Sequence, residues 1–441
     1  MIGGLSRILL YMGIIIIPMS MVTIGGRGSA QGFIYELGRN AGLVAVMILF
    51  SQVLLAARIK WIERPFGLDI LLRFHKYMGI TAAFLLLAHP LLLAAGSGRL
   101  DLLISLKQPV YIWLGKAGLV LLLAHTGFSL YSSRLNLQFE TWRLIHDILA
   151  PVLIAVAFIH SLATGSDLQQ PLMQGLWFVF LIIAAGVYGW HLLIRPIRLK
   201  KRPWQVVEVL PEAPNVWTVK LSPPAGKSIY DYLPGQFQFI TFYRGRNLPV
   251  EEHPWTISSS PTEKKYISST IKSLGDFTAS IKDTRPGDTA AVHGPFGRFS
   301  HVLNPKENDL VFVAGGIGIT PLMSMLRYMR DKKEKKRSVL LLFGNPNTEQ
   351  IVFRRELEKI ESGGVPRLKV VHVLSAPEED WSGERGHIDQ EKITRLGGSD
   401  LSGKSFYVCG PPPLVNDVVN TLLNMGVSYR QIHVEIFSFL D

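Results

Sequence analysis

The sequence predicts a membrane-spanning, all-helical first half followed by a soluble second half that contains a small antiparallel β domain and an α/β domain. Three observations support this fold class. Nearly all long apolar runs of the 441-residue chain lie in its first 195 or so positions. Residues from about 203 to 300 alternate apolar and polar side chains between Pro and Gly, and from about 306 strands alternate with helices. We therefore expect domains over residues 1–200, 201–303 and 304–441.

Six apolar segments are each near the ~20 residues that a helix needs to cross a bilayer. They occupy residues 7–24, 39–59, 74–95, 110–131, 146–164 and 174–195. Lys and Arg concentrate in the connection 58–73 and after residue 194, whereas the connections 96–109 and 165–173 hold fewer of them. Because basic flanking residues favour the cytoplasmic side, we expect a multi-pass protein of the cell (inner) membrane with a cytoplasmic soluble half.

The start of the chain admits a second interpretation. Arg7, the apolar run after it and Gly28-Ser29-Ala30 imitate a cleavable signal peptide. Removal of that segment would leave the soluble half on the predicted cytoplasmic side of the membrane.

Charge and cysteine content exclude other classes of function. The formal charge of +12 raises nucleic acid as a partner, but much of the surplus flanks the apolar segments and no basic stripe is interleaved with aromatics. We therefore expect the lipid bilayer as a partner and no nucleic acid. The single cysteine, Cys409, excludes an internal disulfide framework and a cysteine-ligated metal cluster.

Four histidines within the apolar segments predict metal ligation. His75 and His89 lie fourteen positions apart on the third segment, and His146 and His160 have the same spacing on the fifth. Fourteen residues rise about 21 Å along a helix and return to within about 40° of the same face. Since both segments cross in the same direction, His75 can face His146 (the inner pair) and His89 can face His160 (the outer pair). Two imidazoles fill both axial positions of a haem iron, so the sequence predicts two electron-carrying haems.

Two further histidines lie in apolar segments, His125 in the fourth and His191 in the sixth. A single polar residue in a membrane helix commonly forms a hydrogen bond to a neighbouring helix. We assign that role to both.

The soluble half begins with strands at Trp204–Leu210, Val216–Leu221 and Gln238–Phe242, which suggest a small antiparallel barrel. The stretch His253-Pro254-Trp255-Thr256 ends one strand. Further on, Lys272 is followed by Gly275 and Thr278 at the start of a short helix. A glycine and a threonine at a helix start can present backbone N–H groups to a phosphate, and Lys272 adds charge, although each piece is equally compatible with an ordinary turn.

The last part predicts a dinucleotide crevice. An apolar strand, Asp309–Ala314, leads into Gly315-Gly316-Ile317-Gly318-Ile319-Thr320-Pro321 and a helix from Leu322 to about Met329. Glycines allow close approach of a phosphate, and threonine and proline suit a helix start. Strands at Ser338–Phe343, Leu368–Leu374 and Phe406–Val408 follow, and the last one ends in Cys409-Gly410-Pro411-Pro412. Strand ends that converge at one edge of a parallel sheet form such a crevice.

Taken together, the histidine pairs and these loops resemble the ferric reductase and NADPH oxidase superfamily, in particular a bacterial NADPH oxidase-like member, over nearly the whole chain. The resemblance implies a six-helix di-haem bundle and a ferredoxin–NADP reductase-like module, in which Gly294-Pro295-Phe296-Gly297 joins the two lobes. It implies FAD, two haems of b type, and NADH or NADPH as cofactors. The implied FAD residues are His253, Pro254, Trp255, Thr256, Lys272, Gly275 and Thr278; the implied pyrophosphate loop is Gly315, Gly316, Gly318, Thr320 and Pro321; and the residues implied near the nicotinamide are Cys409, Gly410 and Pro411.

The resemblance also implies residues for the reaction itself. A C-terminal Glu-x-Phe places an aromatic ring on the flavin, which here implies Glu435 and Phe437, with Phe439 as a substitute. Arg39 matches a basic residue at the outer end of the second span. It is expected to hold a haem propionate or to attract oxygen or an anionic chelate, and an interfacial anchor is the alternative.

Two positions depart from the family pattern. Phe343-Gly344-Asn345-Pro346 lacks the arginine that often binds a 2′-phosphate, which favours NADH, although Arg354 and Arg355 could still reach a phosphate. Leu93 stands where eukaryotic oxidases have a further histidine. This departure weakens the case for superoxide as product.

The resemblance implies an NAD(P)H oxidase that passes electrons through FAD and both haems to extracytoplasmic oxygen, with superoxide as the product. A ferric-chelate reductase, an electron-supply subunit for a periplasmic partner and a haem-free membrane flavoprotein are the alternatives.

Overall fold

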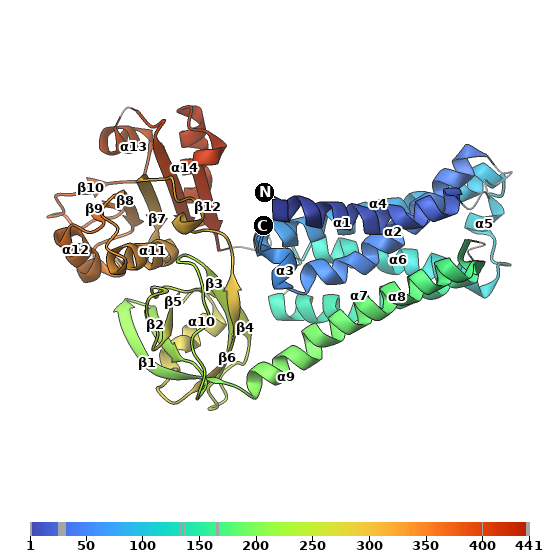
Figure 1. Ribbon diagram of the computed structural model, residues 1–441, viewed down its shortest axis with the longest axis horizontal. Helices are drawn as coiled ribbons and strands as arrows, with labels where there is room; N and C mark the ends of the chain where they lie inside the picture. Colours follow the sequence, from blue (N-terminus) through green and yellow to red (C-terminus); the bar gives the residue numbers. More distant parts are fainter. Residues whose placement is uncertain are drawn as a thin grey trace. The chain divides into compact units, whose positions relative to one another are not determined.

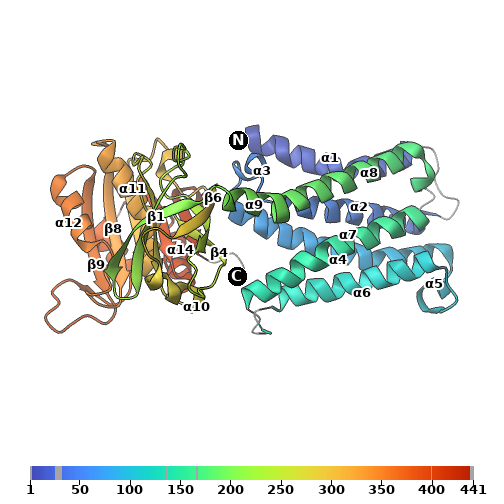
Figure 2. The same ribbon diagram turned by 90° about the horizontal axis from the view of Figure 1, so that it is seen from below.

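The computed structural model describes residues 2–24, 32–132, 134–135, 138–164, 167–398 and 400–437. It divides into two compact units, Met1–Arg195 and Pro196–Asp441, which are described separately (Figures 1 and 2). Gly28-Ser29-Ala30 of the possible signal peptide and Phe439 lie outside the described residues.

Each of the six predicted apolar segments is a helix. The long helices of the first unit are α1 (Ile2–Ile24), α2 (Phe33–Ala56), α4 (Leu68–Ser97), α6 (Val110–Leu130), α7 (Phe139–Thr164) and α8 (Pro171–Gly189). Short elements connect them or continue the last one: α3 (Lys60–Glu63), α5 (Asp101–Ile104), the 3-10 turn η1 (Asp167–Gln169), the π-helical turn η2 (Trp190–Ile194) and α9 (Arg195–Lys200). All six spans are long and apolar enough to cross a membrane, and the last continues to Lys200.

Helix α2 is the most enclosed helix of this unit. It packs along α4, and α6 packs along α7. Met47 on α2 and Trp177 on α8 are fully buried. By contrast, large apolar side chains such as Phe84 and Ile182 are exposed. A surface of this kind suits contact with lipid, where every backbone polar group is satisfied within the helices.

The second unit begins with an antiparallel sheet, as predicted. Its strands are β1 (Trp204–Ala213), β2 (Val216–Ser222), β3 (Phe237–Tyr243), β4 (Glu252–Thr256), β5 (Ile267–Lys272) and β6 (Thr289–Phe296), in the order β4-β3-β6-β1-β2-β5. The outer strands β4 and β5 of this order also contact each other. Helix α10 (Asp276–Ala279) follows β5, and the 3-10 turn η3 (Ser280–Asp283) follows α10.

A six-stranded parallel sheet completes the unit. Its strands are β7 (Asp309–Gly315), β8 (Ser338–Asn345), β9 (Arg367–Leu374), β10 (Glu384–Arg385), β11 (Lys404–Gly410) and β12 (Ile432–Ile436), in the order β10-β9-β8-β7-β11-β12. The strand order reverses between β7 and β11, and such a switch point is where open α/β sheets bind nucleotides.

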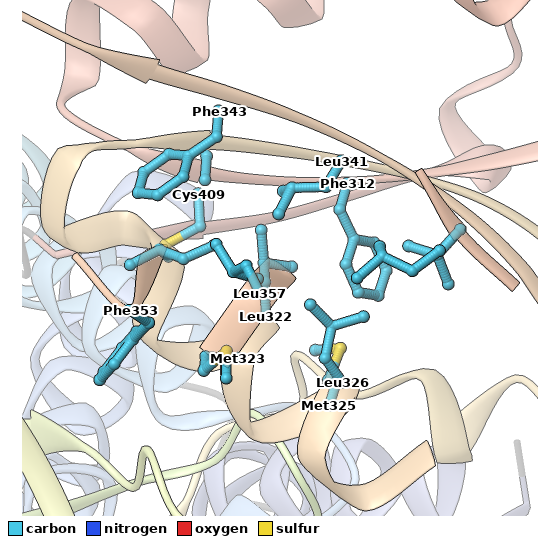
Figure 3. Close-up of a cluster of buried hydrophobic side chains, with 14 of the residues drawn as sticks. Phe312, Leu322, Met323, Met325, Leu326, Leu341, Phe343, Phe353, Leu357 and Cys409 are labelled. Carbon is cyan, nitrogen blue, oxygen red and sulfur yellow. The ribbon is translucent and has the colours of Figure 1, made fainter. Parts of the chain in front are cut away.

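Helices cover both faces of this sheet. Helices α11 (Ile319–Asp331) and α12 (Arg354–Gly363) pack on the face that includes Phe312 and Phe343 (Figure 3). Helices α13 (Gln390–Gly397) and α14 (Pro412–Asn424) pack on the face that includes Val311 and Val408. Since both faces are covered, the strands are apolar on both sides, which accounts for the continuous apolar runs in the sequence.

Candidate functional site

The inner histidines face each other, as their spacing predicts. The ring centroids of His75 on α4 and His146 on α7 are 6.0 Å apart and their planes differ by 58°. A metal–nitrogen bond is about 2 Å long, so two imidazoles on opposite sides of one metal have centroids about 6 Å apart. The arrangement therefore fits a bis-histidine iron between α4 and α7, and ligation itself stays a prediction.

The outer histidines are each held by a backbone carbonyl of a neighbouring helix. Nδ1 of His89 is 2.8 Å from the carbonyl oxygen of Gly38, and Nδ1 of His160 is 2.8 Å from that of Tyr111. The two imidazoles also interact electrostatically with each other. A ring that donates its Nδ1 proton to a carbonyl has an unprotonated Nε2, the tautomer that binds a metal.

A glycine lies beside each of these two rings. A Cβ at Gly42 would be 2.7 Å from Nδ1 of His89, and a Cβ at Gly115 would be 2.5 Å from Cε1 of His160. In both cases the glycine comes four residues after the carbonyl that holds the ring, since Gly38 precedes Gly42 and Tyr111 precedes Gly115. Each outer ring therefore occupies the space that a side chain at the neighbouring glycine would need.

Side chains of neighbouring helices also approach the inner histidines. The amide of Gln52 on α2 approaches Nδ1 of His75 to 2.6 Å. The hydroxyl of Ser129 on α6 lies 3.4 Å from Nδ1 of His146. Sequence reasoning missed Gln52, although a polar residue within an apolar span is a signal of function.

The interhelical role predicted for His125 and His191 holds for one of them. Nδ1 of His191 is 3.0 Å from the carbonyl oxygen of Ala57. His125 is buried and its ring centroid lies 4.5 Å from that of His146, but its Nδ1 has no hydrogen-bond partner among the described residues. It is thus a neighbour of the inner pair.

Arg39 lies on α2 and forms an ion pair with Glu36, one helical turn earlier. Both side chains are largely buried, with exposed fractions of 16% and 22%. The predicted basic residue therefore carries a charge that a neighbouring carboxylate compensates.

The predicted flavin strand is β4, which contains His253, Pro254, Trp255 and Thr256. It pairs antiparallel with β3, and all its residues are half-buried. The His253 ring lies 4.2 Å from that of Phe277 on α10, while Nε1 of Trp255 is buried without a hydrogen-bond partner among the described residues. An unsatisfied indole N–H next to an aromatic pair is compatible with a bound polar ligand.

The turn after β5 differs in detail from the expectation. The hydroxyl of Thr278 accepts hydrogen bonds from the backbone N–H groups of Leu274 (2.8 Å) and Gly275 (2.9 Å). These two donors are therefore used within the turn and are not presented to a phosphate. Lys272 is the last residue of β5, and its role with that of Gly275 and Thr278 stays a prediction.

The glycine loop and the Cys-Gly-Pro run meet at the switch point. A Cβ at Gly318 would lie 2.3 Å from the carbonyl oxygen of Cys409, and one at Gly315 would lie 2.9 Å from Pro411. Gly316 has a φ of +51°, which also favours glycine. Thr320 donates its hydroxyl proton to the carbonyl of Ile317 over 3.0 Å. The backbones of both loops thus approach each other closely at the end of β7 and β11.

Helix α11 begins at Ile319, within this predicted loop and three residues earlier than predicted, and Pro321 lies in its first turn. Gly410 ends β11, where a Cβ would lie 3.1 Å from the backbone nitrogen of Gly315, and Pro411 precedes α14. Helix N-termini at such a crevice favour anionic groups.

Cys409, expected beside the nicotinamide, is buried, whereas Phe437, expected beside the flavin, is exposed. The thiol of Cys409 is fully buried in the core near Phe343, and burial raises its pKa well above the ordinary value (Figure 3). Only its backbone reaches the crevice. Phe437 follows β12 and is 46% exposed, so its ring is available for a flavin contact, which stays a prediction.

A contact that sequence reasoning missed joins the two sheets. Arg327 on α11 donates to the carbonyl of Ser258 (2.6 Å), two residues after the flavin strand, and forms an ion pair with Glu356 on α12 at 2.6 Å. Burial opposes ionisation of Glu356, yet the hydrogen bond and charge of Arg327 lower its pKa. Ser324, one turn earlier, donates to the carbonyl of Ser259 (2.7 Å). The helix that begins at the nucleotide loop is thus bonded to the segment that follows the flavin strand.

Three family profiles match the chain in succession. They are the ferric reductase-like transmembrane component over residues 41–157, the FAD-binding domain over 199–297 and the oxidoreductase NAD-binding domain over 312–420. The first covers both histidine pairs except His160, the second covers the antiparallel sheet, and the third covers the parallel sheet from within β7 to β11 but not β12.

Curated relatives align with parts of the chain. NADH-cytochrome b5 reductase 2 of Neurospora crassa is 30% identical over 168 residues, 37% of this chain and 49% of that protein. The reductase subunit of stachydrine N-demethylase from Rhizobium meliloti is 29% identical over 244 residues, 54% of this chain and 66% of that protein. The chain spans about half or less of the length of the first curated relatives that it matches.

Among solved structures, the FAD/NAD-binding domain of nitric oxide dioxygenase from Vibrio cholerae has a TM-score of 0.47 and 21% identity, and the match covers 53% of this chain and 98% of that one. A ferric reductase-like transmembrane component followed by FAD-binding and NAD-binding domains on one chain is the architecture of the ferric reductase and NADPH oxidase superfamily, and this chain has that architecture.

Proposed function

We propose that this protein is a transmembrane NAD(P)H oxidase, which takes electrons from NAD(P)H on the cytoplasmic side and delivers them through FAD and two bis-histidine haems to extracytoplasmic oxygen, with superoxide as product. The observation that carries the proposal is the pair of histidine sites on α4 and α7. The inner rings have the separation that one iron requires, and both outer rings have Nδ1 at a carbonyl, which leaves Nε2 for a metal. When bound, FAD converts a hydride into single electrons and the haems carry these one at a time.

The soluble unit supplies orientation for the nucleotide. Gly315, Gly316 and Gly318 bring backbone close to the crevice at the sheet switch point, and the N-terminus of α11 favours the pyrophosphate charge. The contacts of Arg327 and Ser324 then hold α11 against the segment after β4. They would keep the nucleotide loop in a fixed position relative to the flavin strand.

The cytoplasmic location of the inner pair is supported by basic residues. Arg58, Lys60 and Arg64 lie in the connection between α2 and α4, close in sequence to His75. Arg195, Arg198 and the cluster at 200–202 follow the last span. The positive-inside rule therefore favours electron flow from the inner pair outward.

Oxygen is favoured over an anionic ferric chelate by the state of Arg39. Its charge is compensated by Glu36, so the attraction for an anion near the outer end of α2 is weakened. A small neutral acceptor needs no such charge. Ferric-chelate reduction is the second candidate, and the match of residues 41–157 to a ferric reductase-like component favours it.

NADH is the favoured donor. Asn345 ends β8 where a 2′-phosphate site would need a cation, and the side chain of Arg354 forms an ion pair with Glu358 (3.2 Å). Glu378 accepts a hydrogen bond from the Thr348 hydroxyl in the loop after β8 (2.6 Å), which adds negative charge there. One relative is named an NADH-dependent reductase, in keeping with this preference.

The acceptor is tested with the purified full chain, FAD, haem and NADH. We expect cytochrome c reduction that superoxide dismutase abolishes. Reduction that persists with the dismutase, and that ferric chelates increase at the expense of oxygen uptake, would establish the ferric reductase instead.

The haem sites are tested by difference spectroscopy of His75→Leu and His160→Leu, each of which should lose one bis-histidine signal. His191→Leu is the matched control, because this histidine belongs to neither pair: its Nδ1 lies 3.0 Å from the carbonyl oxygen of Ala57 and 3.1 Å from Nη1 of Arg195, and its replacement should leave both signals in place. An unchanged spectrum in His75→Leu and His160→Leu would refute the ligand assignment.

A further inference from the structure

A third histidine lies beside the inner pair. His125 is on α6, which packs along α7, and its ring centroid is 4.5 Å from that of His146, with the two planes 34° apart (Figure 2). His125 also interacts electrostatically with His75, the other member of the pair. Three imidazoles, from α4, α6 and α7, therefore form one cluster.

The environment of His125 is unfavourable for an unused polar group. The side chain is 8% exposed in a helix of membrane-spanning length, and its Nδ1 has no hydrogen-bond partner among the described residues. A buried polar group without a partner lowers stability, and ionisable residues inside a membrane commonly serve a function. The interhelical hydrogen bond expected for this residue does not use Nδ1, so a different role has to account for its position.

His146 and His125 differ in how their rings are held. The Ser129 hydroxyl lies 3.4 Å from Nδ1 of His146, which gives this ring the kind of neighbour that a metal-binding histidine commonly has on its other nitrogen. Nδ1 of His125 has no such neighbour in the described part of the chain, so either of its nitrogens can be the unprotonated one that binds a metal. His146 is therefore the better ligand while both are present, and His125 is the ring that can replace it.

We propose that His125 is a reserve axial ligand of the inner haem: when His146 does not bind the iron, a ring nitrogen of His125 binds it opposite His75. One iron–nitrogen bond breaks and another forms, so no electron is transferred and no co-reactant is needed. The exchange requires a displacement of the order of the 4.5 Å between the two ring centroids. The proposal rests on the proposed haem ligation by His75 and His146.

The test is the spin state of the iron in purified full-chain His146→Gly, measured by visible and electron paramagnetic resonance spectroscopy with and without added imidazole. A haem iron with two axial histidines is low-spin, whereas one with a single histidine is high-spin. We expect His146→Gly to retain two haems by the pyridine haemochrome assay, both low-spin before imidazole is added. One resonance signal should move from its wild-type position, and imidazole should change nothing.

Two further variants isolate His125. The double variant, His146→Gly with His125→Leu, should lose one low-spin haem, either from the protein or to a high-spin form that imidazole converts back to low spin. His125→Leu alone should keep both low-spin signals, because His146 is then the ligand.

His160→Gly is the matched control, since it makes the same change on the same helix at the outer pair. The two remaining histidines of the described spans contact His146 (His125) and the Ala57 carbonyl (His191), so neither is available to His160. This variant should lose one low-spin signal, in contrast to His146→Gly.

The proposal is overturned if His146→Gly retains only one haem, if one of its haems is high-spin until imidazole is added, if the double variant keeps both low-spin haems, or if His125→Leu alone loses a low-spin signal. A wild-type protein with fewer than two haems, or an unchanged spectrum in His75→Leu, refutes the proposed function instead. These two measurements come first, so the two failures are distinguished.

Discussion

The substitution Gly115→Ala adds one carbon atom beside His160 and so tests whether this ring binds a haem in the outer pair. The added Cβ would lie 2.5 Å from Cε1 of His160, whereas ordinary contact begins at 3.4 Å. The ring must therefore withdraw by about 0.9 Å, the difference between these two distances. Metal–ligand distances tolerate about 0.2 Å, so a ring displaced this far no longer reaches an iron in the same position.

The expected cost follows from overpacking. Forcing an extra carbon into a packed site costs about 1–3 kcal/mol. Since 1.4 kcal/mol corresponds to a tenfold change in affinity, haem binding at the outer site should weaken by about 5- to 150-fold. The pyridine haemochrome assay on purified protein should then give a haem content that falls from two towards one per chain.

Gly127→Ala is the matched control. Gly127 lies on the same helix, and a Cβ there would meet nothing within 4 Å. Both substitutions gain at most about 1 kcal/mol of helix propensity, so a difference between them reports the contact with His160. Retention of two haems with an unchanged spectrum in Gly115→Ala would refute the pocket described for the outer pair.

Three further predictions concern the soluble unit. Gly318→Ala, whose Cβ would meet the Cys409 carbonyl at 2.3 Å, should raise the KM for NADH at least tenfold in steady-state assays while FAD content stays constant. Arg327→Met should lower the stability of the unit by about 2 kcal/mol, because it leaves Glu356 partly buried without this partner, and flavin release on heating measures the change. Burial, with a smaller effect of nearby positive charge, lowers the pKa of His372 to about 4, so the unfolded chain binds a proton that the folded chain does not between pH 6.5 and 4. The free energy of unfolding should therefore fall as the pH drops through this range, by at most about 3 kcal/mol, and a wild-type-like pH dependence in His372→Phe would contradict the assignment.

Gly318→Ala and Arg327→Met each have a control variant with the same substitution at another position. Gly363→Ala on α12 meets no atom within 4 Å and should leave the KM unchanged. Arg354→Met removes an exposed ion pair with Glu358 and should change stability by less than about 1 kcal/mol. Equal effects in variant and control would show that the close contacts at Gly318 and Arg327 are not the cause.

The fold was predictable because its signals are periodic and repeated. Six apolar segments of spanning length, and strands that alternate with helices after residue 306, each specify an element without reference to the rest of the chain. The equal spacing of His75–His89 and His146–His160 likewise predicted which rings face each other, because helical geometry converts spacing into direction.

The residues that contact the four histidines were not predictable in the same way. Gln52, Gly42 and Gly115 lie on helices whose rotation about their own axes is set by packing, not by any pattern in their own sequence. The thiol of Cys409 was expected at the crevice, but alternation along β11 turns it into the core and leaves only its backbone at the nucleotide loop.

The burial of Cys409 has a practical consequence. It is the sole cysteine of the chain, and its side chain has no exposed surface. Thiol reagents therefore find no site on the folded wild-type protein. A cysteine introduced at an exposed position of either unit would react alone, so spin labels or fluorophores can be attached in chosen pairs without first removing a native residue.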